Sequence, residues 1–404
     1  MESFKGFLKE GGAFGHLSHP FDVNFSKAQL IRIVRNSLEL KFDYPEIKTD
    51  AINLMVSVKN GTVISARNRG HLLNFGEKAM SIKDIAAKFR GRSIGVAYER
   101  AMEDFQQAVS KLSRAQVKKI FDEGRHWMSI EVMGQGAQNI IDYGGISEIR
   151  LHGTIEHNEK GEKVAQINKE SARMFDGMLR QIQADRQKHF HIRRLTPAQF
   201  KPIANVNKIK ADIVIQLNSV MGKAKTVDDY KTTELKKHFK TRDPELINTL
   251  VNRYINRDKS QTITTIYKNY PQDKQWIQQL DKNIGPIMKN IMIPIEHVFL
   301  RLGSIVVGAL NVFMALDPKE TSKDLHNKLK QAVDLIKTKG KEGDIKKLEM
   351  ELARLKAAGY DGTASSIPAE EGITFFVGDQ FVKLTGKFAP INAIIGAIYQ
   401  MQEE

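Results

Sequence analysis

Apolar and polar residues alternate in the amino-terminal part of this chain in a way that predicts a β-hairpin. The alternation runs from Ile52 to Val58 and from Thr62 to Ala66, and Lys59-Asn60-Gly61 separates the two runs. Asn-Gly between such runs is a strong hairpin signal because both residues tolerate a positive φ. We therefore predict an antiparallel pair of strands here.

Three more strands are predicted from apolar runs of similar length. Residues 127–133 form one run, and residues 370–377 and 380–385 form two others around a tight turn at Gly378-Asp379. Two of these runs carry an acidic residue, Glu131 in the first and Glu371 at the start of the second. A carboxylate within a buried strand is costly without a partner, so both acids are candidate functional residues.

The middle of the chain has a helical pattern instead, with apolar residues at intervals of three and four. The segments with this spacing are residues 172–188, 226–240, 244–256, 284–316 and 322–358. We predict an α+β chain in which a discontinuous domain, residues 1–154 and 366–404, is interrupted by an all-helical insert, residues 155–365. The flanking domain contains the antiparallel sheets.

Composition limits the possible functions. The chain has 404 residues, of which 41% are hydrophobic, which is enough for two or three domains with cores. It has no cysteine, so disulfides, thiolate metal sites and cysteine nucleophiles are excluded. Zinc-ligand spacing, the phosphate-binding P-loop and the dinucleotide-binding glycine pattern are also absent.

The sequence favours a cytoplasmic protein with no membrane partner. The stretch Val298–Leu316 contains Arg301 and Asn311 and leaves roughly 15 uncharged residues, fewer than a bilayer requires, so we predict a buried helix. Residues 1–5 lack the apolar core of a signal peptide. The absence of cysteine fits a reducing compartment.

The positive charge lies mostly in the predicted insert. The formal net charge is +15, and residues 155–365 hold about 38 Lys and Arg against about 25 Asp and Glu. Basic helices attract nucleic acid through its phosphates, whereas the alternative is a solvated helical surface with surplus lysines. The candidate phosphate contacts are Lys208, Lys210, Lys223, Lys225, Lys236 and Lys237.

Lys48 is the candidate nucleophile. It lies in the segment Glu46-Ile47-Lys48-Thr49-Asp50, just before the hairpin. We expect the hairpin to bring these side chains to one sheet face, and packing beside Ile47 to lower the pKa of the lysine. The alternative is a solvated lysine at a strand edge, paired with Glu46 or Asp50.

Taken in order, these segments resemble the covalent nucleotidyltransferases, that is, the ATP-dependent polynucleotide ligases and mRNA capping enzymes. Lys48-Thr49-Asp50-Ala51 is similar to the first motif of the family, with Ala51 in place of glycine, and Asn53 and Arg67 look most like RNA ligases that seal nicks. Glu131, Glu371-Gly372-Ile373 and Lys383 resemble the third, fourth and fifth motifs. The segments 15–22 and 383–392 also resemble uncharacterised tailed-phage proteins, which would place this chain in the cytoplasm of a bacterial host.

The resemblance implies a fold, an activity and a role for each matched residue. The flanks would form an adenylation domain in which Lys48 attacks the α-phosphate of ATP, and AMP then passes to a 5′-phosphate that is joined to a 3′-hydroxyl. Lys383 would neutralise the phosphate, and Glu371 would contact Mg²⁺ or Mn²⁺. The nucleotide or the nucleic-acid end would be held by Glu46, Asp50, Asn53, Arg67, Glu131, Tyr143 and Lys387.

Several positions leave alternatives open. Tyr143 either provides the aromatic face for adenine or is a core tyrosine, and His16 and His19 either contact phosphate or cap a turn. The family's second lysine of the fifth motif is Thr385 here, so we expect Lys387 to replace it if the strand continues.

The overall activity is open as well. About 17 residues follow Lys387, too few for the oligonucleotide-binding barrel of DNA ligases, so the basic insert would grip a duplex or structured RNA. RNA or DNA, and ATP or GTP, remain possible substrates. The same fold also suits a nucleotide-transferring modifier of another target, or a non-catalytic scaffold that binds nucleic acid.

Overall fold

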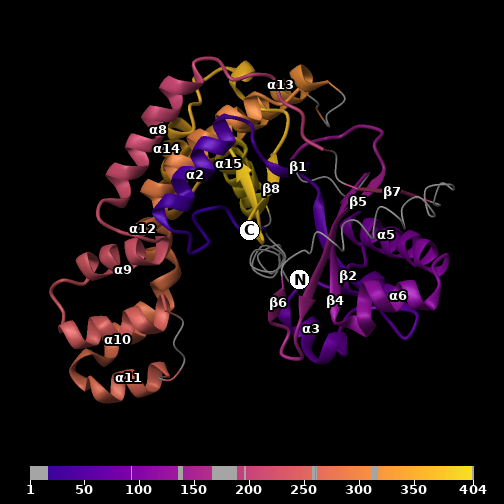
Figure 1. Ribbon diagram of the computed structural model, residues 1–404, viewed down its shortest axis with the longest axis horizontal. Coiled ribbons are helices and arrows are strands. Elements are labelled where there is room, and N and C mark those ends of the chain that lie inside the picture. The colour runs from indigo at the N-terminus through magenta and orange to yellow at the C-terminus, as the bar shows by residue number, and fades with distance from the viewer. Residues whose placement is uncertain are drawn as a thin grey trace.

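The protein has an α+β fold, as the sequence predicts, built from two sheets and the helices that cover them (Figure 1). The computed structural model describes residues 17–91, 93–134, 140–165, 189–194, 197–256, 260, 262–311, 313 and 317–402. The predicted helix at residues 172–188 and the candidate His16 lie outside the described residues.

The first sheet joins strands from opposite ends of the chain. Its antiparallel strands are β1 (Asp43–Lys48), β8 (Gly372–Val377) and β9 (Gln380–Thr385), in the order β1-β8-β9. The predicted hairpin at the carboxyl end is confirmed as β8 and β9. Its first strand begins at Gly372, so Glu371 directly precedes it.

The second sheet contains the remaining strands. Its order is β3-β2-β4-β5-β6, formed by β2 (Ile52–Lys59), β3 (Thr62–Ala66), β4 (His126–Met133), β5 (Glu148–His157) and β6 (Lys163–Ala165); β7 (His191–Arg194) lies parallel to β5. The predicted hairpin is confirmed as β2 and β3. Asn60 and Gly61 at its turn have φ of 51° and 74°, which fits the Asn-Gly signal.

Helices account for most of the rest of the described chain. On the amino-terminal side they are α2 (Lys27–Leu38), α3 (Arg69–Gly76), α4 (Ile82–Lys88), α5 (Ser93–Ser110) and α6 (Arg114–Phe121). Beyond β7 they are α8 (Val206–Met221), α9 (Val227–His238), α10 (Pro244–Tyr254), α11 (Ile263–Asn269), α12 (Lys274–Gly308), α13 (Pro318–Lys339), α14 (Glu342–Ala357) and α15 (Phe388–Gln402).

The predicted helices at residues 226–240 and 244–256 are confirmed as α9 and α10. Side-chain caps explain why they begin where they do, since Thr226 and Asp243 accept hydrogen bonds from first-turn N–H groups. The prediction of residues 284–316 corresponds to α12, which begins earlier and ends at Gly308. The prediction of one helix over residues 322–358 is wrong, because two helices meet near Gly340.

The hydrophobic cores cut across the predicted domain boundaries. One core packs α2, α8 and α12–α15 against the first sheet, and a second packs α4–α6 against the second sheet. A third, smaller core holds α9–α11 and the first half of α12. The predicted all-helical insert also differs from the structure, because β6, β7 and the end of β5 lie within residues 155–365. Helices of the insert thus complete the core of the first sheet.

The two sheets contact each other through one face of each. Phe376 and Phe381 of the first sheet share an apolar cluster with Met55 and Trp127 of the second. The polar residues Lys383, Asn53 and Glu131 lie two or four positions from Phe381, Met55 and Trp127 on the same strands. Side chains separated by an even number of residues project from the same face of a strand, so these polar and apolar groups share a face of each sheet. We call these the inner faces. The apolar cluster holds the sheets together beside the polar groups.

Residues 298–308 of the predicted buried helix, 298–316, belong to α12, which ends at Gly308. Residues 271–308 are long and apolar enough to cross a membrane by length and composition, and half of the most apolar window is buried inside the protein. Val298, Phe299, Leu302 and Val306 pack into the core of the first sheet. This packing agrees with a core helix, which passes the same test of length and composition.

Helix α12 approaches the first sheet so closely that it requires glycine at the contact. A Cβ at Gly303 would lie 2.0 Å from the carbonyl oxygen of Thr385, whereas a Cβ at Gly285 of the same helix would meet no atom within 4 Å. The backbone of β9 therefore rests directly on the helix. This contact fixes the end of the strand that carries Lys383.

We predict that Gly303→Ala destabilises the protein while Gly285→Ala does not. The added methyl group at position 303 must displace backbone, which costs about 1–3 kcal/mol of the free energy of unfolding. Position 285 is exposed and precedes Pro286, whose ring offsets the helix preference of alanine, so we expect a change of less than about 0.5 kcal/mol there. Urea unfolding of both variants measures the difference, and equal stabilities would contradict the close contact.

Candidate active site

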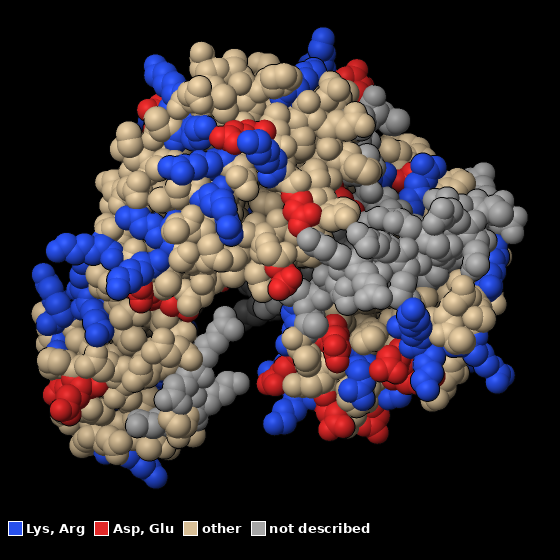
Figure 2. Space-filling model, in the orientation of Figure 1, with Lys and Arg blue, Asp and Glu red and all other residues tan. Residues whose placement is uncertain are grey.

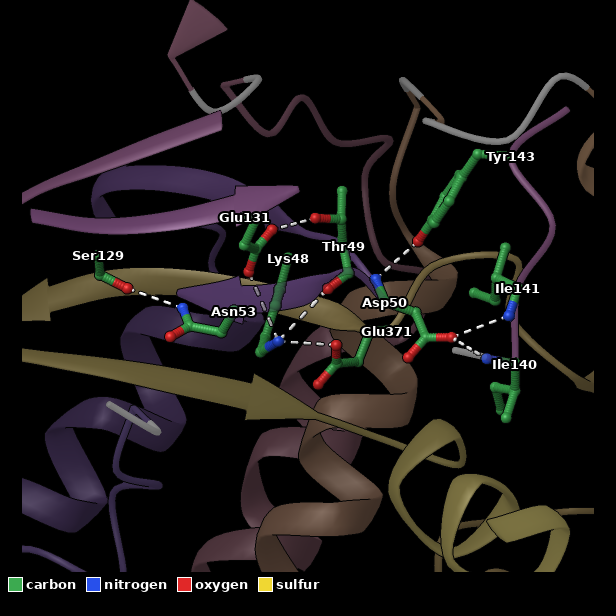
Figure 3. Close-up of polar contacts among 10 residues, drawn as sticks. All are labelled: Lys48, Thr49, Asp50, Asn53, Ser129, Glu131, Ile140, Ile141, Tyr143 and Glu371. Carbon is green, nitrogen blue, oxygen red and sulfur yellow. Dashed lines mark hydrogen bonds and ion pairs between the residues drawn. The ribbon is translucent and has the colours of Figure 1, made fainter. Parts of the chain in front are cut away.

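The candidate site lies where the chain leaves the first sheet and enters the second. Lys48 ends β1, and Thr49-Asp50-Ala51 connects it to β2. Glu131 comes from β4, and Glu371 from the residue before β8 (Figure 3). Three segments that are distant in sequence therefore meet at one lysine. The expectation that Lys48 belongs to the β2–β3 hairpin face is wrong, because Lys48 belongs to the other sheet.

Lys48 is held between the two predicted acids. Its Nζ lies 2.7 Å from Oε2 of Glu371 and 3.8 Å from Oε1 of Glu131, and it donates to the carbonyl oxygen of Thr49 at 3.4 Å. The side chains of Lys48, Glu131 and Glu371 are only 13%, 4% and 15% exposed. The remaining oxygen of Glu131 accepts a hydrogen bond from the Thr49 hydroxyl. The cluster is largely buried from solvent, so its charges interact more strongly than charges on the surface do.

The pKa of Lys48 is raised, which corrects the expectation that apolar packing lowers it. Burial does favour the neutral amine, but the attraction of Glu371, of Glu131 and of Asp50 outweighs burial and raises the pKa of Lys48. These neighbours therefore favour the charged ammonium of Lys48 over the neutral amine. A nucleophilic role would require a bound group to compensate the charge of these acids, because only the neutral amine has a free lone pair.

Asp50 fixes the connection between the sheets. One of its carboxylate oxygens accepts from the backbone N–H of Ile140 at 2.7 Å and of Ile141 at 2.8 Å. The N–H of Asp50 donates to the Tyr143 hydroxyl at 2.7 Å. The Asp50 carboxylate thus organises the segment after β4.

Tyr143 is a core residue rather than an open adenine platform. It is 3% exposed and belongs to the core of the first sheet. Burial, together with the neighbouring charge of Asp50, raises the pKa of Tyr143 well above its ordinary value. Of the two interpretations left open by the sequence, the structure favours the core tyrosine, which supports the site by holding Asp50.

The first sheet carries a row of polar residues on its inner face. Glu46 pairs with Thr374, and Thr374 pairs with Lys383, so these three side chains lie side by side across β1, β8 and β9. Lys48 lies on the same face as Glu46, two residues further along β1. Ile47, Ile373 and Leu384 form the neighbouring row and pack into the core on the opposite face.

Lys383 provides a second cation near Lys48. Burial and the repulsion of Lys48 lower the pKa of Lys383, against the attraction of Glu371 and Asp22. Asp22 is near because Ser18 bridges to Val382 at the edge of β9 and accepts from the N–H of Lys383. Sequence reasoning missed Asp22, since only this edge contact brings it to the site.

His19 belongs to a turn, as one of its two interpretations predicts. Its backbone N–H donates to a carboxylate oxygen of Asp22 at 2.8 Å, and its ring stacks on Phe21 with centroids 4.9 Å apart.

Lys387 does not replace the second lysine of the fifth motif. Strand β9 ends at Thr385, so the alternation on which that expectation depended stops there. Nζ of Lys387 donates to the carbonyl oxygen of Ser366 at 2.7 Å. Thr385 itself is buried.

Asn53 lies in β2 of the second sheet, and Arg67 directly follows β3. Asn53 pairs with Glu131 and donates from Nδ2 to the Ser129 hydroxyl at 2.8 Å. The Arg67 guanidinium stacks on Phe89 and Tyr98, and the Tyr98 hydroxyl donates to the carbonyl oxygen of Asn53. Arg67 is thus linked to Asn53 through an aromatic ring.

Ala51 occupies a position that does not require glycine for its backbone. It is absent from the residues with positive φ, and its side chain packs against the core of the first sheet.

The six candidate phosphate-binding lysines lie on the helical part of the molecule, where Lys and Arg gather over α2, α8 and α9 (Figure 2). Lys210 pairs with Glu39 at 2.7 Å, and Lys237 pairs with Glu234 at 2.6 Å. The other four, Lys208, Lys223, Lys225 and Lys236, are exposed and form no ion pair with any residue that the structure describes. These four remain suited to phosphate contact.

Glu371 is the carboxylate best placed to contact a metal ion beside Lys48. Within the described parts of the chain, no three His, Asp or Glu side chains cluster as ligands of a protein-only metal site. Mg²⁺ often binds through one or two carboxylates together with substrate phosphates and water. The partly exposed Glu371 fits that donor set, because its carboxylate lies at the lysine.

We predict that Glu371→Gln lowers the pKa of Lys48 more than Glu131→Gln does. Removing an anion disfavours the ammonium, and the contact with Glu371 is shorter, 2.7 Å against 3.8 Å. The rate of Lys48 acetylation, followed by mass spectrometry across pH, gives the midpoint for each variant. A midpoint that stays constant or rises in Glu371→Gln would contradict this electrostatic account.

Comparisons with known proteins leave the function to be inferred from this geometry. No family model, no curated protein and no solved structure matches the chain.

Proposed function

We propose that the protein is a covalent nucleotidyltransferase that acts on polynucleotide ends, most specifically an ATP-dependent RNA ligase. One observation carries the proposal: the lysine of the first motif, the acid of the third and the acid of the fourth form a single cluster, with Lys48 between Glu131 and Glu371. Lys383 of the fifth motif adds its charge to the same cluster. The resemblance to this superfamily is itself part of the proposal.

The chemistry follows from the charges of the cluster. The Nζ of Lys48 would attack the α-phosphorus of ATP, forming a P–N bond and breaking the bond to the pyrophosphate leaving group. A magnesium ion at Glu371 would supply positive charge to the phosphates. Compensation of the Glu371 charge would lower the pKa of Lys48, so that its proton could pass to solvent before the attack.

The other residues of the site orient the reacting groups. Lys383 neutralises charge on the α-phosphate, and Glu131 holds the ribose hydroxyls once its bond to Thr49 is exchanged. AMP then moves from Lys48 to a 5′-phosphate, and a 3′-hydroxyl displaces it. The exposed lysines of α8, of α9 and of the loop between them hold the backbone of the polynucleotide by neutralising its phosphates.

We predict that the protein becomes labelled by ATP carrying a radioactive α-phosphate, and that Lys48→Ala abolishes the label. A phosphoramidate should be labile in acid and stable in alkali. Lys346→Ala is the matched control, because Lys346 is an exposed lysine of α14 paired with Glu342. Wild-type protein that takes no label from ATP or GTP, or equal label on Lys48→Ala, would refute the covalent mechanism.

Labelled protein should discharge AMP into a nicked duplex and seal it. We expect nicks in RNA to be sealed faster than nicks in DNA, as measured by gel electrophoresis of the end-labelled strands. Label that forms but passes only to a protein acceptor would replace the ligase assignment by that of a protein modifier.

A non-catalytic nucleic-acid-binding role is the second candidate, and the net charge of +15 favours it. For this role, binding survives Lys48→Ala and falls steeply with salt. We predict that Lys223→Ala with Lys225→Ala weakens duplex binding and reduces its salt dependence by about one to two counterions, measured by fluorescence anisotropy at several salt concentrations. An unchanged slope would remove this surface from the interface.

A further inference from the structure

A polar row on the second sheet continues beyond Glu131. Asn53 of β2 pairs with Glu131 of β4, Glu131 pairs with Arg150 of β5, and Arg150 pairs with Arg193 of β7. Paired residues on neighbouring strands project to the same face, and their Cα atoms lie about 5 Å apart. Two arginines therefore follow directly after the acid that contacts Lys48, on the inner face.

Glu148 joins the two arginines into one group. Its Oε2 accepts from Nε of Arg150 at 3.0 Å and from a terminal nitrogen of the same guanidinium, and its Oε1 lies 3.2 Å from Nε of Arg193. One carboxylate between two guanidinium groups leaves the group net positive. Glu148 also holds both guanidinium groups in place, which lowers the entropy cost of binding an anion.

The group extends from the interior to the surface. The Arg150 side chain is 5% exposed, and that of Arg193 is 56% exposed. Guanidinium groups bind phosphate through paired N–H donors, and a partly buried pair of them binds it more strongly than surface lysines do. The opposite face of this sheet carries Ile130, Ile149 and Ile192 in the second core, so these strands are fixed by packing.

We propose that Arg150 and Arg193, bridged by Glu148, form a phosphate-binding site that adjoins the Lys48 cluster. The inference deepens the proposed function and rests on it, because it takes Lys48 as the reacting centre. The ligand is a terminal phosphate of the substrate, either the 5′-phosphate of a polynucleotide or the β- and γ-phosphates of ATP. Neither arginine is assigned a role by the motifs of the resemblance.

The test titrates the protein with two short RNA duplexes that differ only at an overhanging 5′ end, which carries a phosphate in one and a hydroxyl in the other. Fluorescence anisotropy measures the binding of each duplex. Wild-type protein should prefer the phosphorylated end by about tenfold, and Arg193→Ala should lose that preference. Arg193→Lys should restore only part of this preference, because lysine keeps the positive charge but lacks the paired N–H donors of the guanidinium group. Arg69→Ala is the matched control, since Arg69 pairs with Glu162 and is 52% exposed.

Calorimetric titration with pyrophosphate separates the two sources of phosphate. If wild type lacks the end preference but binds pyrophosphate, and Arg193→Ala binds it about tenfold more weakly, the site takes the phosphates of ATP. If Arg193→Ala changes neither binding, the arginines only fix β7 to β5 and the proposal is overturned. Lys48→Ala should keep the phosphate binding, so failure of the covalent mechanism leaves this test valid.

Discussion

The structure of the candidate site depends on the hydrogen bonds that Asp50 makes at the junction of the two sheets. Asp50 lies in the short link between β1 and β2, and its carboxylate accepts two N–H groups from the segment after β4. A buried carboxylate is tolerated only with such partners. These bonds hold together the end of β1 and the segment that follows Glu131, so the position of Lys48 relative to Glu131 depends on them.

Charge balance around Lys48 provides the second constraint. The ammonium group of Lys48 pairs with two largely buried carboxylates, Glu131 and Glu371, and these carboxylates raise the pKa of Lys48. The same contacts therefore favour the charged ammonium of Lys48 over the neutral amine. Under the proposed nucleotidyltransferase activity, the lysine would become reactive only when substrate phosphate and its cation compensate the acids. Lys383, whose pKa is lowered, interacts electrostatically with both Lys48 and Glu371.

The helices of the predicted insert serve two purposes at once. Helix α12 packs against the backbone of β9 at Gly303 and thereby supports the strand that carries Lys383. Helices α8 and α9 present exposed lysines on the outside of the same body. Residues 155–365 therefore do not form an independent module, since the first sheet has its core among them. Any polynucleotide held by these lysines is held by the body that contains β1, β8 and β9.

The sequence alone determined the β2–β3 and β8–β9 hairpins and the strand that carries Glu131, because alternation and tight-turn residues are local signals that burial reinforces. It also determined α9 and α10, whose caps lie next to them in the chain. Only the tertiary structure decided that Lys48 and Asn53 belong to different sheets, that its neighbours raise the pKa of Lys48, and that Lys387 faces Ser366. The row from Glu131 to Arg193 was equally invisible, because strand register joins residues that are distant in sequence and no local pattern encodes it.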